Sequence, residues 1–152
     1  MIITVISDSH GNIETIKKLL PTFQKSQMVV HLGDHFYDMD SFKGILSDKL
    51  ITVYGNCDGG GEDVVINKEG IKILICHGDK YHVKTGLYRL YLRAKEVGAT
   101  LVLYGHTHIP KIDFQDGVTL INPGALSKFG NKTYCQISLT DGVINPTIYN
   151  LE

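Results

Sequence analysis

The chain has 152 residues, of which 43% are hydrophobic and 20% charged, with a formal net charge of −1. This length and composition predict one globular domain over residues 1–152 with a buried core. The weak net charge offers no electropositive surface for a nucleic-acid backbone, so we expect no specific nucleic-acid partner. Neither a run of roughly 20 apolar residues nor a secretory signal pattern is present, so we expect no membrane association.

The cysteines, Cys57, Cys76 and Cys135, show no C-x-x-C spacing. An odd count without that spacing argues against a disulfide framework and against a structural zinc site. Together with the missing signal pattern, this predicts a protein of the reducing cytoplasm.

The first third of the chain alternates between strand and helix patterns. Apolar runs at residues 2–6, 28–32 and 50–53 are typical of buried strands. A helix is predicted over residues 14–20, with Pro21 expected to end it, and a shorter helix over residues 40–46. This strand-helix-strand order favours largely parallel strands with helices outside the sheet.

The middle of the chain reads as a hairpin, a helix and a further strand, and the last third reads as hairpins. Strands are predicted at residues 64–67, 71–75, 101–104, 111–114, 118–121, 133–139 and 143–149. Turn signals such as Asp116-Gly117 and Asp141-Gly142 separate the paired strands. A longer helix is predicted over residues 83–97. The expected fold class is α/β (α+β in some schemes), with two packed mixed β-sheets forming a β-sandwich flanked by helices.

Short polar motifs follow five of the predicted buried strands. They are Asp8-Ser9-His10, Gly33-Asp34, Gly55-Asn56-Cys57-Asp58, Cys76-His77-Gly78 and Gly105-His106-Thr107-His108. Each motif alone is more often a turn or a cap than a ligand, so the combination carries the prediction. Ligands bind beyond the carboxyl ends of strands in open α/β sheets, so we expect these side chains to converge. Their oxygen and nitrogen donors suit ions such as Mn²⁺, Fe²⁺, Zn²⁺ or Ni²⁺.

Spacing within the motifs indicates how ligands can share ions. Asp8 and His10 are two residues apart, so in extended backbone both face one side and can reach one ion. His106 and His108 have the same spacing, but can also contact one ion each. Asp34 has two carboxylate oxygens and can bridge two ions.

The remaining two motifs offer one donor each. Asn56 offers a neutral carbonyl oxygen, and His77 alternates with Cys76, whose sulfur should point the other way.

In this order the motifs resemble the calcineurin-like metallophosphoesterase superfamily, most closely its small single-domain phosphodiesterases of bacteria and archaea. The resemblance runs from Ile2 to about Leu139 and includes Asn122-Pro123-Gly124. It implies a β-sandwich fold with a dinuclear metal centre. The implied ligands of one ion are Asp8, His10, Asp34 and His108, and those of the other are Asp34, Asn56, His77 and His106.

The resemblance also implies chemistry. Two divalent ions, Mn²⁺ first and Ni²⁺, Fe²⁺, Zn²⁺ or Co²⁺ as alternatives, would activate a bridging water or hydroxide for in-line attack on phosphorus. The residues implied to take part in catalysis are Asp34, Asn56, Asp58 and His77. For Asp58 an orienting role and a plain turn role are equally compatible with the sequence.

The chain departs from the family pattern at Cys57, where many members have a histidine that protonates the leaving group. That role is worth about 10²–10⁴ in rate, so we expect a preference for good leaving groups. Nearby dications should lower the thiol pKa. A second departure is Ala125, where serine commonly follows Asn-Pro-Gly.

Other polar side chains fit simpler roles. His31 lies within an apolar strand and is expected to be hydrogen-bonded, while His35 can contact substrate or solvent equally well. His82 is expected in a surface loop, and Arg89 and Arg93 on a solvated helix face.

The favoured function is therefore a metal-dependent phosphoesterase acting on a small phosphodiester. The alternatives are a phosphomonoesterase and a non-catalytic interaction scaffold like the retromer subunit Vps29, which has a similar fold. The closing strands leave a possible open sheet edge, so a homo-oligomer is a further hypothesis.

Overall fold

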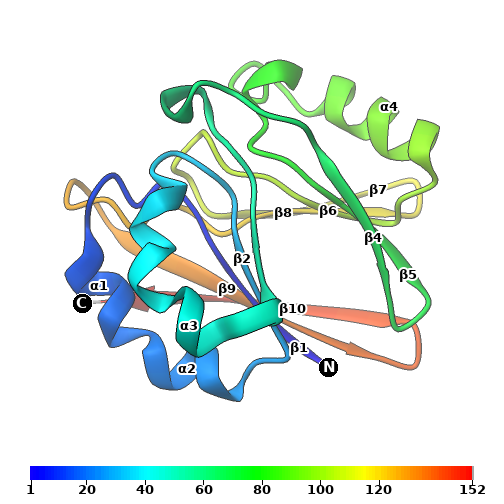
Figure 1. The fold of residues 1–152 in the computed structure, drawn as a ribbon. Helices are drawn as coiled ribbons and strands as arrows, with labels where there is room; N and C mark the ends of the chain where they lie inside the picture. The colour runs from blue at the N-terminus through cyan, green and yellow to red at the C-terminus, as the bar shows by residue number, and fades with distance from the viewer. Residues whose placement is uncertain (152) are drawn as a thin grey trace.

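The computed structural model describes residues 1–151, which form two five-stranded sheets (Figure 1). The first sheet has the order β10-β9-β1-β2-β3. Its strands are β1 (Ile2–Ile6), β2 (Met28–His31), β3 (Leu50–Thr52), β9 (Lys132–Thr140) and β10 (Val143–Leu151). Strands β1, β2 and β3 run parallel, whereas β9 is antiparallel to both of its neighbours.

The second sheet has the order β4-β5-β6-β8-β7. Its strands are β4 (Val64–Lys68), β5 (Ile71–Ile75), β6 (Leu101–Leu103), β7 (Lys111–Gln115) and β8 (Val118–Asn122). The central three are parallel, and β4 and β7 pair antiparallel at the two edges. Both sheets are mixed, so the predicted fold class is confirmed.

Helices cover the outer faces of the two sheets. They are α1 (Ile13–Lys18), α2 (Leu20–Lys25), α3 (Lys43–Leu46) and α4 (Tyr88–Val97). Short 3-10 turns are η1 (Phe36–Phe42), η2 (Ser47–Lys49), η3 (Asn56–Asp58) and η4 (Asp79–Tyr81). Figure 1 shows α4 alone against the second sheet, with α1, α2 and α3 against the first. Within residues 1–151, no helix is long and apolar enough to cross a membrane.

Alternation along the strands divides the core into three layers. Between the sheets, fully buried side chains such as Val5, Ile73 and Leu103 pack together. Their neighbours in sequence point outward, where Leu74 and Val102 pack under Leu90 and Ala94 of α4. On the other side, Ile6 and Val29 pack with Ile16 and Phe23. Burial on both faces explains why these strands read as continuous apolar runs.

Two helix predictions are wrong at their boundaries. Pro21 does not end the first helix region but lies in the first turn of α2, where its missing N–H is not needed. The helix predicted from residue 83 begins only at Tyr88. Gly86 has a φ of 144°, which no helix contains, and Val83 is drawn into the cluster beneath α4. Residues 83–87 therefore form a loop.

The third helix prediction, over residues 40–46, is also only half right. The segment is divided between the 3-10 turn η1 and the single α-helical turn α3.

Loops from both sheets meet at one edge of the sandwich. The backbone N–H of Asp8, after β1, donates to the Gly33 carbonyl after β2 at 3.0 Å. In the second sheet the Gly105 N–H, after β6, donates to the His77 carbonyl after β5 at 2.8 Å. The polar motifs lie in these loops, so the topology brings them together.

Candidate metal centre

The predicted ligands gather into two groups at this edge. The first contains Asp8, His10, Asp34 and His108, and the second contains Asp34, His77 and His106. Within each group the ligand atoms all lie within 4.8 Å of one another. Asp34 belongs to both groups, the position that a bridging carboxylate would need.

Asn56 lies beside the second group. Its Oδ1 is 3.1 Å from His77 Nε2, and His106 Nδ1 is 3.2 Å from the same nitrogen. Exposure rises across the site, from Asp8, which is fully buried, to His108, whose side chain is 44% exposed. The site is therefore open to solvent on one side.

The donor set fits a divalent cation. Asp8 Oδ1 and His10 Nε2 are buried and have no hydrogen-bond partner among the described residues. His108 Nε2 lies 3.2 Å from Asp8 Oδ1, yet the pair lacks hydrogen-bond alignment. An unpaired buried polar atom costs about 1–3 kcal/mol, and here the unpaired atoms surround one point. A cation at that point would satisfy them together.

The ligands also sit in unusual backbone conformations. Positive φ angles occur at Asp8 (52°), His10 (43°), Asp34 (59°), His106 (71°) and His108 (65°). Such angles are uncommon outside glycine and collect at functional sites, where the surrounding structure holds them. The turns therefore direct these side chains inward at a cost in backbone energy.

Asp58 holds the turn that carries Asp34. Its Oδ2 accepts hydrogen bonds from the backbone N–H groups of Asp34 (2.8 Å) and Gly55 (2.9 Å), and its Oδ1 accepts from His35 N–H (2.8 Å). In return, Asp34 Oδ1 accepts from the Cys57 N–H at 2.9 Å. These contacts are those of an orienting residue, and neither ligand group contains Asp58.

Close packing of these turns requires glycine. A Cβ on Gly55 would lie 2.1 Å from Asp34 Oδ1, and one on Gly33 would lie 2.5 Å from the Gly55 nitrogen. The two loops that end β2 and β3 therefore touch backbone to backbone, which places Asp34 and Asn56 on the same side.

A sequence model of the calcineurin-like phosphoesterase superfamily domain matches residues 1–142. The chain belongs to this superfamily. It is 31% identical over 130 residues to the probable metallophosphoesterase YsnB of Bacillus subtilis, covering 83% of this chain and 75% of that protein. It is 28% identical over 150 residues to a phosphodiesterase of Methanocaldococcus jannaschii, covering 82% of this chain and 83% of that protein.

A solved structure shows the same fold. Vps29 of Entamoeba histolytica, a single mutant, superposes with a TM-score of 0.77 at 18% identity, and the match covers 100% of both chains. At this identity the likeness shows the fold alone.

In this calcineurin-like phosphoesterase, the shared carboxylate is strongly acidic. Burial raises the pKa of Asp34, but contacts with His77 and the Cys57 N–H outweigh this and hold it well below its usual range. Burial lowers the pKa of His77, but the contact with Asp34 and the charge of Asp8 outweigh burial and raise this pKa above its ordinary value. Asp34 Oδ2 is 3.5 Å from His77 Nε2, so each group favours the charged form of the other.

The outer histidines of the superfamily site respond differently. Contact with Asp8 raises the pKa of His108. Burial lowers the pKa of His106, and the charges of His77 and Lys84 lower it further. Burial and the Asp34 carboxylate raise the pKa of Cys57. The lower thiol pKa expected from the sequence depends on bound cations and stays a prediction.

Two supporting residues of this phosphoesterase were not found from the sequence. Asp38 Oδ2 accepts from Ser9 Oγ and from the Gly11 N–H, both at 2.7 Å, which fixes the first motif. Asn122 donates from Nδ2 to the Gly105 carbonyl (3.0 Å) and to Thr107. The sequence shows the Asn-Pro-Gly motif, but only the fold shows that its asparagine holds the loop Gly105-His106-Thr107-His108.

The other polar predictions for this superfamily member mostly agree with the structure. His31 is fully buried, with Nε2 2.8 Å from Ser9 Oγ, and burial lowers its pKa to about 4. His82 is exposed, as predicted for a loop residue. Cys76 packs beneath α4, with its sulfur away from the site. The His35 ring lies beside that of His10, with centroids 5.2 Å apart and planes inclined by 55°.

The helix arginines are solvated, as predicted. Arg93 pairs with Glu96 at 2.8 Å on the surface of α4, and Arg89 is exposed. Ala125 is buried at 3% exposure, so the position that is commonly serine in the family faces the interior here.

Proposed function

We propose that this chain is a metal-dependent phosphodiesterase that holds two divalent ions, with Mn²⁺ favoured and Ni²⁺, Fe²⁺, Zn²⁺ or Co²⁺ as alternatives. The observation that carries the proposal is the place of Asp34 in both ligand groups. The residues proposed as ligands are Asp8, His10, Asp34 and His108 for one ion and Asp34, Asn56, His77 and His106 for the other. When bound, such a pair of ions supplies a hydroxide nucleophile near neutral pH and neutralises charge that develops on phosphoryl oxygens.

The protein's own part in the reaction is to position these groups. Asp58 accepts hydrogen bonds from the backbone N–H groups of Asp34, His35 and Gly55, which restrains the turn that carries the shared carboxylate. His77 is held by its Nδ1, 2.7 Å from the Leu32 carbonyl, which directs Nε2 toward Asp34 and Asn56. Restraints of this kind around metal ligands typically change affinity or activity by 10- to 100-fold.

The chain lacks an obvious general acid. Cys57 is exposed beside Asn56, and in the protein alone its thiol pKa is raised. A thiol donates a proton less readily near neutral pH than the histidine that many family members have at this position, so hydrolysis should favour diesters whose leaving group needs no proton. Aryl diesters should therefore be better substrates than alkyl diesters.

The placement of the arginines favours a diester over a monoester. The two arginines of the chain, Arg89 and Arg93, both lie on α4. A phosphomonoester is a dianion near neutral pH and gains more from added cationic side chains than a diester does. The M. jannaschii relative named as a phosphodiesterase supports the same choice.

The test is metal removal and restoration. The chelated protein should lose its activity on bis(4-nitrophenyl) phosphate, and Mn²⁺ should restore it together with about two equivalents of bound metal. Activity on 4-nitrophenyl phosphate, a monoester with the same leaving group, should stay lower. Unchanged diester turnover in protein shown to be free of metal would contradict the proposal.

The second candidate is an interaction scaffold, favoured by the superposition on Vps29. The unpaired buried atoms at Asp8 and His10 argue against it, because a scaffold has no need of them. A preparation that takes up no divalent ion under any loading condition would favour the scaffold over the enzyme.

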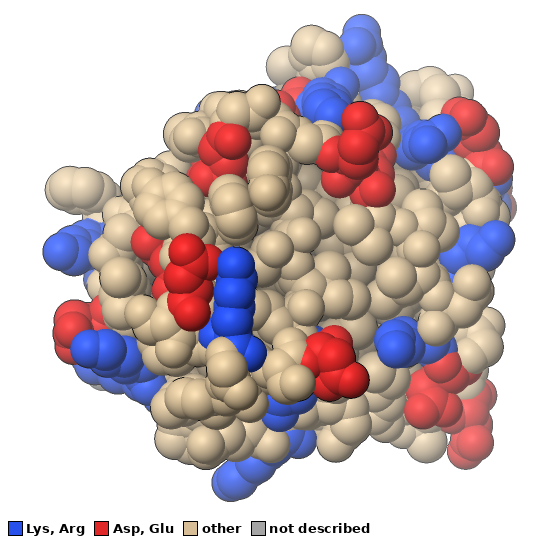
Figure 2. Space-filling view, in the orientation of Figure 1, with Lys and Arg blue, Asp and Glu red and all other residues tan. Residues whose placement is uncertain are grey.

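The proposed setting is the cytoplasm, with a small phosphodiester as substrate and no specific nucleic-acid partner. All three cysteines are free, which suits a reducing compartment. Figure 2 shows acidic and basic side chains interspersed over the face viewed. Strand β10 forms a sheet edge with Val143 exposed, so a homo-oligomer through this edge is also proposed. Light scattering that gives the monomer mass of 16.9 kDa at micromolar concentration would reject it.

A further inference from the structure

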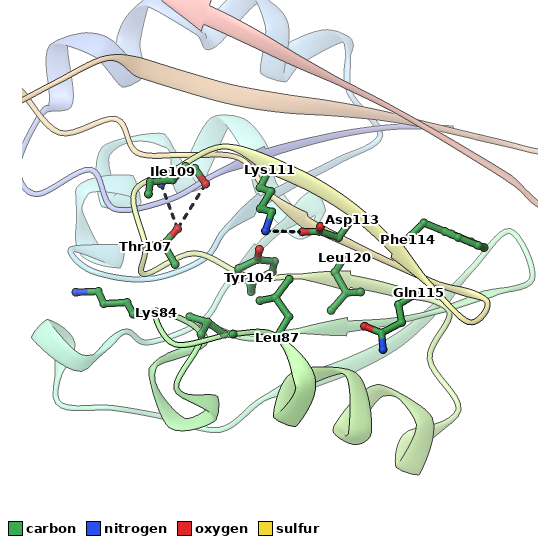
Figure 3. A pocket seen from close by; sticks show the side chains of 12 residues that line it. Lys84, Leu87, Tyr104, Thr107, Ile109, Lys111, Asp113, Phe114, Gln115 and Leu120 are labelled. Atoms are coloured by element: carbon green, nitrogen blue, oxygen red, sulfur yellow. Dashed lines mark hydrogen bonds and ion pairs between the residues drawn. The ribbon is translucent and has the colours of Figure 1, made fainter.

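A cavity of about 720 Å³ lies between the loop before α4 and the β7–β8 hairpin. Its size is within the range of small-molecule sites, roughly 300–1,000 Å³. Figure 3 shows Lys84 and Thr107 at one end of this cavity and Phe114 and Gln115 at the other. None of the proposed metal ligands lines it, so the cavity is a separate feature of the molecule.

The cavity nevertheless adjoins the candidate metal centre. Thr107, which lines it, stands between His106 and His108 in the chain and is held by Asn122 at 2.9 Å. Lys84 lines the same end, and it forms no ion pair with any residue of the described 1–151. A substrate phosphate at the metal centre would therefore lie near Lys84, an unpaired cation at the mouth of the cavity.

The middle of the cavity offers flat apolar surface. Tyr104 and Leu120 are buried, at 2% and 1% exposure, and form its floor with Leu87 (Figure 3). Phe114, at the far end, is 75% exposed. Because Tyr104 and Leu120 are almost wholly covered already, a ring lying over this floor would remove from water mainly the apolar surface of Leu87 and Phe114.

One polar atom inside this wall lacks a partner. Asp113 Oδ2 is buried and accepts no hydrogen bond from the described residues. Lys111 Nζ lies 3.6 Å away, beyond hydrogen-bond distance, so the hydrogen-bond capacity of this oxygen remains. A ligand with an N–H or O–H group could supply the missing donor.

We propose that this cavity binds the organic arm of the substrate, a flat, uncharged ring that carries an N–H or O–H donor. The ring lies against Tyr104, Leu87 and Leu120, its donor faces Asp113, and Lys84 contacts the phosphate that joins the ring to the metal centre. The assignment of the ring as one arm of a phosphodiester rests on the proposed function. Binding of the ring itself does not depend on the proposed function.

The first test is binding, without turnover. Benzamide is added to the purified chain, and NMR follows the methyl groups of Leu87 and Leu120 and the ring of Phe114. These signals should shift together and saturate, and N,N-dimethylbenzamide, which has no N–H, should bind about tenfold more weakly. In Asp113→Leu the two probes should bind alike, whereas the control Asp48→Leu, at an exposed turn, should keep the difference.

Shifts that never saturate, or that map away from these residues, would overturn the proposal. Equal binding of the two probes by the wild-type protein would also overturn the role of Asp113. Asp113 lies on an edge strand, so its replacement removes no core packing. A second variant, Asp113→Asn, keeps an acceptor oxygen and should keep a preference for benzamide.

The second test is catalytic and uses two diesters with the same 4-nitrophenolate leaving group. One has a methyl group as its second arm and the other a 3-carbamoylphenyl group. Asp113→Leu should reduce the kcat/KM preference for the carbamoylphenyl ester by about tenfold, and Asp48→Leu should not. Lys84→Ala should raise KM for both esters by about two- to fivefold, and the exposed Lys18→Ala should not.

The two tests separate the two proposals. If metal-loaded protein hydrolyses neither ester, the phosphodiesterase assignment fails, and the NMR result alone decides whether the cavity binds the ring. If both esters are hydrolysed with a preference that Asp113→Leu leaves unchanged, the cavity assignment fails and the proposed function stands.

Discussion

Two neighbouring regions meet at Thr107 and are built in different ways. At the candidate metal centre the ligands occupy turns with positive φ, and hydrogen bonds from backbone N–H groups to the carboxylates of Asp58 and Asp38 hold those turns. The cavity beside it is lined by a regular hairpin and a loop, with exposed Lys84 and Phe114 at its ends. At the metal centre the position of each side chain depends on its neighbours. In the cavity most side chains can be substituted without displacing the others.

This contrast suggests a division of labour within the fold. Strained turns are stable only when many contacts restrain them, so a change in one ligand should disturb the whole centre. Side chains on an edge strand or loop make fewer obligatory contacts, so the cavity can vary in preference without loss of the metal site. The predictions below test each side of the contrast, beginning with the largest expected effect.

Asp34→Asn should reduce turnover of bis(4-nitrophenyl) phosphate by at least about 100-fold. The change keeps the size of the side chain but removes the charge that both ligand groups share. Metal analysis should show weaker binding in parallel. His82→Ala, at an exposed turn, is the matched control and should cost little. Equal losses in the two variants would show that the ligand assignment is wrong.

Acidification should destabilise the protein through His31. Burial lowers the pKa of this histidine from 6.5 to about 4, so between these values the unfolded chain binds a proton that the folded protein does not. The free energy of unfolding should therefore fall as the pH falls through this window, by roughly 3 kcal/mol in total.

Urea denaturation at several pH values measures the effect. His31→Asn carries no titratable group and should lose most of this pH dependence, although its stability at pH 7 will be lower because the contact with Ser9 changes. His82→Asn should keep the slope of the wild-type protein. The same slope in wild type and His31→Asn would assign the acid sensitivity to another group.

Asp58→Asn should weaken metal binding and turnover by about 10- to 100-fold without removing a proposed ligand. An amide can accept only through its oxygen, so at least one of the three backbone N–H groups loses its partner. Metal titration should show the loss, and excess Mn²⁺ should recover part of the turnover. An unchanged metal affinity would show that the turn around Asp34 needs no such restraint.

Cys57 should have the smallest effect at the centre. Cys57→Ser and Cys57→Ala should each reduce turnover of aryl diesters by less than about tenfold, below the usual contribution of a general acid. Cys57→His should improve hydrolysis of diesters with poorer leaving groups if the imidazole can donate a proton there. A series of substituted aryl diesters at fixed metal concentration measures this. A thousandfold loss in Cys57→Ala with metal retained would give the thiol a catalytic role.

The sequence by itself determined the strands, the order of the motifs and the proposed ligands. Apolar runs and turn residues act over a few positions, so each strand end, such as Ile75 before His77, could be read locally. The same reasoning failed at Pro21 and at residues 83–87, where packing and a glycine with positive φ moved the helix boundaries.

Only the tertiary structure decided which groups share a site. That Asp34 lies between two ligand groups, and that Asp58 holds it, depends on contacts between loops that follow different strands. The unpaired oxygen of Asp113 and the cavity around it arise where a hairpin meets the loop before α4. A local sequence pattern cannot predict such contacts, because they depend on strand order and on packing across the whole chain.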